Sequence, residues 1–243
     1  MQKNLPSTID YNKLHSIPDD PTFGVADTVE QKDIRLPRLM IMQKTSKMME
    51  DVSLGAKLGE WRSSDGELMS VDGKLDVLIF LMRKYWVIKR LEKTKWKYFA
   101  IEDHTVKNAD APWQFETDEG TFKRILTYDF TCCPTHKLME LPYVFTLAGT
   151  SRRAAQAIAT KASQLRLLKK SSASVVFQLS SHIETSDENS FHVVDAKATR
   201  NATPTELETV YSWHKVISAS RVTVDEPDDA VDKEHDEDES VRY

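Results

Sequence analysis

The stretch LDVLIFLMRKYWVIKRLEKTKWKYFAIED, residues 75–103, carries the longest strand signal in the chain. It is rich in β-branched and aromatic residues and contains neither glycine nor proline, which is typical of strands. We expect one strand up to Leu91, a turn at residues 92–94, and a partner strand from Lys95 onward.

Shorter apolar segments on both sides of this hairpin predict further strands. We expect them at residues 39–42, 59–68, 121–131, 141–150, 172–184 and 189–199, whereas residues 108–120 have the composition of a loop. Many short strands with two helices predict a single β-rich α+β domain over residues 33–222. Its expected architecture is an OB-fold-like antiparallel barrel with one or two packed helices.

Two segments have helical character. Residues 150–170 place alanine, isoleucine and leucine near helical spacing and include no acidic residue. Residues 203–218 begin with Thr203 as N-cap, Pro204 in the first turn and Glu206 three residues after the cap. This is the capping-box pattern, so we expect the second helix to start there.

The charge is distributed unevenly along the chain. The formal net charge is −5, but residues 225–243 contain ten acidic and two basic residues, a net charge of −8. The rest of the chain therefore carries +3, so a mildly basic body precedes an acidic tail, assigned to residues 223–243. Residues 1–32 are polar and contain three prolines, and we expect them, like the tail, to be disordered.

The composition excludes several classes of protein. Apolar runs are too short for a bilayer span or a signal peptide, so we expect a cytoplasmic protein without membrane contact. Two cysteines cannot make a disulfide-rich fold. There is no glycine-rich phosphate loop, no G-x-S-x-G and no H-E-x-x-H. We therefore expect no enzymatic activity and no cofactor.

The segment Cys132-Cys133-Pro134-Thr135-His136 is the nearest approach to a metal motif. Two thiolates and an imidazole are suitable zinc ligands, but adjacent cysteines rarely aim at one ion. The alternative is one buried thiol beside one partly exposed thiol at the end of a strand.

Aromatic and cationic side chains alternate within residues 82–99. Period two puts Arg83, Tyr85 and Lys89 on one face of the first strand and Lys84, Trp86 and Arg90 on the other. Single-stranded nucleic acid requires cations for phosphates and rings for bases. The predicted contacts are Arg83, Lys84, Tyr85, Trp86, Lys89, Arg90, Lys95, Trp96, Lys97 and Tyr98 from the hairpin, with Arg152 and Arg153 from the basic helix. Alternatively, the rings fill a core and the cations are merely solvated.

Two further pairs, Trp61-Arg62 and Lys123-Arg124, could extend this surface. The acidic tail could be only solubilising. It also ends in an aromatic ring, so it could bind a partner protein through Asp236, Glu237, Asp238, Glu239 and Tyr243.

A basic, barrel-like body followed by an acidic tail with a terminal aromatic resembles the single-stranded-DNA-binding replication proteins of bacteriophages and bacteria. The segments LPRLMIMQ, GEWRSSDGEL, LDVLIFLMRKYWV and LPYVFTLAGTSRRAAQAI are similar in pattern to phage OB-fold proteins of this kind. The resemblance covers roughly residues 36–181 and the tail. It implies coating of transient single strands in replication or recombination, and recruitment of partner proteins through the tail.

Three functional hypotheses follow. The first is sequence-independent single-stranded DNA binding, with a possible homo-oligomer. The second is a non-catalytic protein–protein adaptor or virion-associated β-domain whose hairpin is core. The third, a metal-dependent enzyme, depends on the zinc alternative for residues 132–136.

Overall fold

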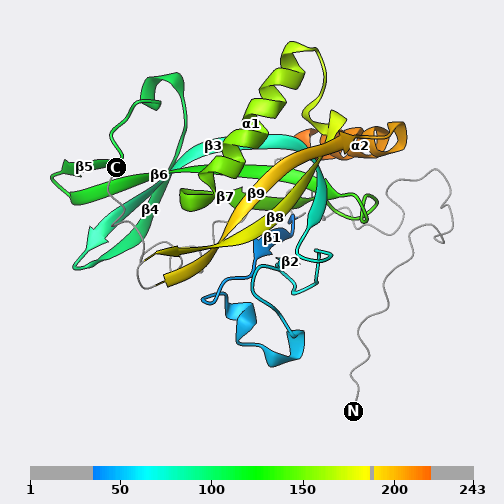
Figure 1. Cartoon of the computed structure of the whole chain (residues 1–243). Coiled ribbons are helices and arrows are strands. Elements are labelled where there is room, and N and C mark those ends of the chain that lie inside the picture. The colour runs from blue at the N-terminus through cyan, green and yellow to red at the C-terminus, as the bar shows by residue number, and fades with distance from the viewer. Residues whose placement is uncertain (1–34, 187–188, 220–243) are drawn as a thin grey trace, which may run out of the picture.

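A computed structural model describes residues 35–186 and 189–219 (Figure 1). The expected disordered arm (residues 1–32) and acidic tail (residues 223–243) lie outside the described residues. In chain order the strands and helices are β1 (Arg38–Ile41), β2 (Trp61–Ser63), β3 (Leu75–Glu92), β4 (Lys95–Asp103), β5 (Gln114–Thr117), β6 (Gly120–Pro134), β7 (Tyr143–Leu147), α1 (Arg152–Leu167), β8 (Val175–Ser186), β9 (Asn189–Asn201) and α2 (Pro204–Ala219). Within the described ranges no helix is long and apolar enough to cross a bilayer.

The strands form one strongly curved sheet with the order β2-β1-β7-β6-β3-β8-β9, while β4 pairs with β3 and β5 with β6. The strand pairs are antiparallel, except for β1 and β7, which run parallel. The expected β-rich α+β class, with a barrel-like sheet and packed helices, is confirmed.

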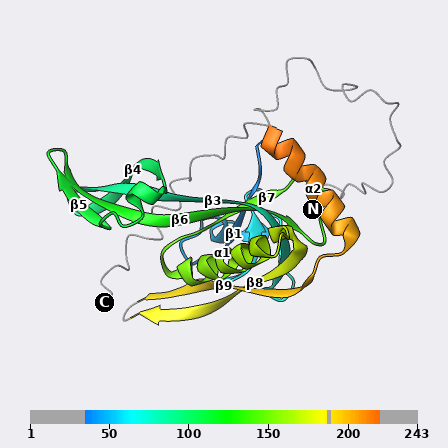
Figure 2. The ribbon, with the colours of Figure 1, turned by 90° about the horizontal axis from the view of Figure 1, so that it is seen from above.

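Strands β3 and β6 belong to two parts of the molecule. Residues 75–77 of β3 pair with β8, whereas residues 85–92 pair with β4. Likewise, β6 pairs with β5 in its first half and with β7 in its second. Residues 85–103 and 114–127 thus form a four-stranded arm, which projects from the curved sheet in both views (Figures 1 and 2).

The core has one cluster on each face of the sheet because successive strand residues point to opposite faces. Val77 and Ile79 join the larger cluster on the inner face, where Ile158 of α1 packs. Leu78 joins the smaller cluster on the outer face, together with Val210 of α2. The two helices therefore bury opposite faces of the same sheet.

A side chain bridges the loop after β1 to β9. The amide of Gln43 donates from Nε2 to the carbonyl of His192 at 2.7 Å and accepts the His192 N–H at Oε1 at 2.8 Å. This reproduces the two hydrogen bonds that a neighbouring strand would make. Gly59 lies against the same histidine with φ +78°, and a Cβ there would be 2.6 Å from His192 Cε1, so the position requires glycine.

The expected capping box of α2 is confirmed. The Thr203 N–H donates to Glu206 Oε2 at 2.7 Å, and the Glu206 N–H donates to Thr203 Oγ1 at 3.3 Å. Arg200 of β9 also donates two hydrogen bonds to the Glu206 carboxylate, at 2.8 and 2.6 Å. The start of α2 is thereby fixed to the end of β9.

The expected loop over residues 108–120 is wrong in part, because residues 114–117 form β5. Phe115 stacks on Phe122 of β6 with ring centroids 5.4 Å apart. A strand of four residues is too short to leave a clear alternation in the sequence. Its only strand partner within the described residues is β6.

Candidate nucleic-acid interface

The arm contains the basic and aromatic hairpin. Register with β6 places Lys84, Trp86, Ile88 and Arg90 on the inner face of β3 and Arg83, Tyr85, Val87 and Lys89 on the outer face. This agrees with the alternation expected from the sequence.

Two of the four predicted stacking rings are not accessible, which corrects the expectation for them. Tyr85 is 2% exposed and Trp86 is 8% exposed. Burial and the adjacent Asp129, which hydrogen-bonds the phenol, raise the pKa of Tyr85, while Trp86 stacks on His104 with centroids 5.6 Å apart. Both rings lie where the arm joins the curved sheet, so the sheet and the loop after β4 cover them.

The other two rings are half-buried on the outer face. Lys123 Nζ lies 4.7 Å from the centre of the Trp96 ring and so occupies one of its π-faces. Tyr98 lies opposite Lys89 in the strand register, and Lys89 is 1% exposed. Lys89 is therefore not a surface phosphate contact in this conformation, contrary to the expectation.

Several hairpin cations are already paired with carboxylates. Arg83 contacts Asp103 at 2.8 Å, while Arg90 and Lys97 share Glu92 at 2.7 and 2.9 Å. Hydrogen bonds from Arg90 and then Lys97 lower the pKa of Glu92 to about 2. These three cations are therefore locally neutralised, and a phosphate would have to compete with a carboxylate for each of them.

A second group of predicted cations is different. Lys84, Lys95, Arg152 and Arg153 form no ion pair with a carboxylate of residues 35–186 or 189–219. Lys84 Nζ lies 5.6 Å from the centre of the Tyr128 ring, and burial together with the nearby Arg152 charge lowers the pKa of Lys84. We call Lys84, Arg152 and Arg153 the junction cluster: Arg152 lies near Lys84 at the base of the arm, and Arg153 follows it in the first turn of α1.

The start of α1 intensifies this positive region. Arg152 and Arg153 occupy the first turn, which contains no acidic residue, and the chain has none between Glu140 and Glu184. The positive end of the helix dipole disfavours cations there. Placing two arginines at this position therefore costs stability and concentrates positive potential.

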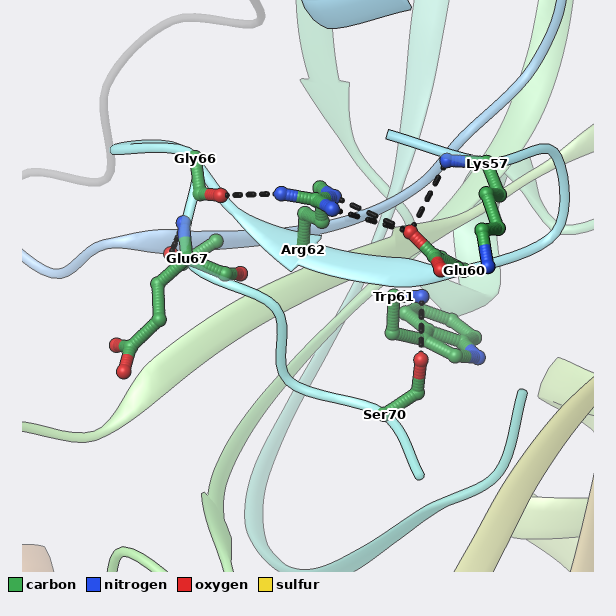
Figure 3. Close-up of polar contacts among 8 residues, drawn as sticks. Lys57, Glu60, Trp61, Arg62, Gly66, Glu67 and Ser70 are labelled. Carbon is green, nitrogen blue, oxygen red and sulfur yellow. Dashed lines mark hydrogen bonds and ion pairs between the residues drawn. The ribbon is translucent and has the colours of Figure 1, made fainter. Parts of the chain in front are cut away.

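The two further pairs do not extend this surface. Trp61 is 2% exposed, and Arg62, which is 6% exposed, donates to Glu60 at 3.1 Å and to the carbonyl of Gly66 at 2.8 Å (Figure 3). Arg124 pairs with Glu102 at 3.3 Å, and Lys123 is 2% exposed. Internal partners therefore hold these cations.

Two exposed rings were not among the predicted contacts. Phe99 is 45% exposed and Trp113 is 62% exposed. Phe99 closes the aromatic and basic run of β4, and Trp113 follows Pro112 in the expected loop. The sequence could have indicated the exposed ring of Trp113, because this tryptophan stands alone in a polar loop segment.

The zinc alternative lacks the required geometry. Cys132 packs in the inner cluster and Cys133 in the outer one, so the two thiols point to opposite faces of β6. Burial raises the pKa of Cys133 to about 12 and that of Cys132 well above its ordinary value. Within the described residues no group of three His, Cys, Asp or Glu side chains could hold a metal ion. The expectation of one partly exposed thiol is also wrong, because both are buried.

Comparison with known proteins finds no matching family model, no matching curated protein and no matching solved structure. The predicted partner-binding residues Asp236, Glu237, Asp238, Glu239 and Tyr243 lie outside the described residues.

Proposed function

We propose that this protein binds single-stranded DNA without sequence preference and without catalysis, in replication or recombination. The observation that carries the proposal is the junction cluster. Lys84 and Arg152 bring positive charge together, Arg153 adds to it in the first turn of α1, and none of the three pairs with a carboxylate of the described residues. Like charges held together without counter-charges favour a polyanionic ligand, whose phosphates supply the missing partners.

The salt dependence of binding to an oligo-dT tests this proposal. Each phosphate contact with a single strand contributes about 0.7 to the slope of log affinity against log salt. The triple variant K84Q/R152Q/R153Q should therefore reduce the slope by about 2. Fluorescence anisotropy with a labelled oligo-dT of about 20 nucleotides, longer than one typical binding site, measures it.

The chain provides a matched control with the same change of formal charge. The triple variant R83Q/R90Q/K97Q removes three cations that are paired with Asp103 or Glu92, so the slope should change by less than about 1. Absence of oligo-dT binding by the unmodified protein at low salt would end the proposal.

A non-catalytic adaptor is the second candidate, and two observations favour it for the hairpin. Tyr85 and Trp86 are buried, and the cations Arg83, Arg90 and Lys97 are interrupted by carboxylates. An adaptor predicts unchanged tryptophan fluorescence when single-stranded DNA is added, whereas DNA binding near exposed Trp113 predicts quenching.

The acidic tail extends the proposal to partner proteins of replication or recombination. Deleting residues 225–243 should preserve or increase DNA affinity, because ten acidic residues that compete with phosphates are removed. Co-precipitation of partner proteins should be lost. Lower DNA affinity after the deletion would contradict the assigned role of the tail.

A further inference from the structure

The inner face of the arm carries a row of phenylalanine rings that come from three of its four strands, β4, β6 and β5. Phe99 of β4 meets Phe122 of β6 edge-on with centroids 5.0 Å apart, and Phe122 stacks on Phe115 of β5 at 5.4 Å. We call Phe99, Phe115 and Phe122, with the adjacent Trp113, the arm aromatic face. Within this face Phe122 is buried, whereas Phe99 is 45% and Trp113 is 62% exposed.

Two arginine guanidinium groups lie over rings of this row. The guanidinium carbon of Arg124 is 4.0 Å from the centre of the Phe115 ring, and that of Arg90 is 5.7 Å from the Phe99 ring. Carboxylates hold both groups, Glu102 for Arg124 and Glu92 for Arg90. An arginine neutralised in this way is a poor phosphate contact but still offers a planar surface for stacking.

The position of Trp113 is fixed by the backbone. Its carbonyl accepts the Arg124 N–H at 2.6 Å, and the Arg124 side chain donates to the carbonyl of Pro112 at 3.4 Å. The Trp113 backbone therefore lies at the margin of the row, beside Arg124, whose guanidinium lies over Phe115. A large ring held this far into solvent gives up favourable burial, which a stacking ligand would restore.

We propose that the arm aromatic face stacks unpaired nucleobases, with Trp113 and Phe99 as the contacting rings. The inference rests on the proposed DNA binding and adds the base contacts to it. The junction cluster at the base of the arm contacts the phosphates, while Phe99 and Trp113, farther along the arm, stack on the bases. Base pairs hide their π-faces inside a duplex, so this surface selects single strands.

Two oligomers distinguish the contribution of base stacking to affinity from the contribution of phosphate contacts. One is an oligo-dT, and the other has the same length and sugar–phosphate backbone but abasic sites in place of thymine. W113A and F99A should each weaken oligo-dT binding by about 5- to 150-fold, the cost of one lost base stack. Binding of the abasic oligomer and the salt slope should stay unchanged, because neither ring carries charge.

Tyr211 provides the matched control. It is 60% exposed and lies on α2, outside the arm, so Y211A should bind both oligomers as the unmodified protein does. Circular dichroism and thermal unfolding establish that each variant is folded.

The outcomes distinguish this inference from the proposal beneath it. Binding of oligo-dT by W113A and F99A within about two-fold of the unmodified protein would overturn the stacking role and leave DNA binding intact. If W113A and F99A weakened binding of oligo-dT and of the abasic oligomer equally, the stacking role would also be overturned. The rings would then contact the sugar–phosphate backbone of the DNA and not its bases. If the unmodified protein binds neither oligomer, both proposals fail together.

Discussion

Glu206 joins the start of α2 to β9, and its removal gives a quantitative test of the fold. The Glu206→Ala change removes the acceptor for the Thr203 N–H and for two hydrogen bonds from Arg200. Loss of a cap costs about 0.5–2 kcal/mol, and an exposed ion pair contributes about 0.2–1 kcal/mol more. We expect the free energy of unfolding to fall by about 2 kcal/mol at neutral pH.

The lowered pKa of Glu206 gives an upper bound on the loss of unfolding free energy in Glu206→Ala. Hydrogen bonds from Arg200, and then those from Thr203, lower this pKa from 4.5 to about 2. Such a lowering corresponds to about 3 kcal/mol, which must be discounted because the Arg200 side chain is 44% exposed. After this discount, the value agrees with the loss of about 2 kcal/mol expected from the cap and the ion pair.

The same lowering of the Glu206 pKa determines how the stability that this carboxylate contributes changes with pH. The folded pKa lies below the unfolded value, so the carboxylate contributes its full stability above pH 4.5 and loses it as the pH falls toward about 2. The difference in stability between the unmodified protein and Glu206→Ala should thus narrow below about pH 4.5.

Urea unfolding of the full chain, followed by circular dichroism between about pH 3 and pH 7, measures this difference. Glu206→Gln retains an acceptor for the cap and should lose only part of the stability. The exposed Glu208 on the same helix is the control, and Glu208→Gln should change stability by less than about 0.5 kcal/mol. A pH-independent difference, or one below about 0.5 kcal/mol at neutral pH, would refute the argument.

Three further outcomes are expected. Gln43→Leu should cost about 1–3 kcal/mol in urea unfolding, because the backbone of His192 loses both partners; an unchanged midpoint would contradict the bridging role. Gly59→Ala should lower the melting temperature more than Gly73→Ala, since both have positive φ but only Gly59 has atoms within 4 Å of an added Cβ; equal effects would contradict the close contact. The two cysteine thiols should react with Ellman's reagent only on unfolding, because both are buried with raised pKa values; rapid labelling of the native protein would show otherwise.

Local patterns decided much of the fold. The alternation in residues 75–103 predicted both strands and the distribution of side chains between two faces, because the strand period depends only on backbone geometry. The capping box of α2 was equally predictable, since Thr203 and Glu206 satisfy each other's N–H groups within one turn. These features need no information from distant parts of the chain.

Accessibility and charge pairing were decided by tertiary structure. Tyr85 and Trp96 have similar sequence surroundings, yet Tyr85 is buried at the base of the arm and Trp96 is half-buried near its tip. Arg83 is neutralised by Asp103, twenty residues away, whereas Lys84 meets Arg152 from another element. The exposed Trp113 owes its place to a four-stranded arm whose edge strand, β5, forms only against β6. Alternation assigns side chains to a face, but only the packing of distant segments determines whether that face is open to a ligand.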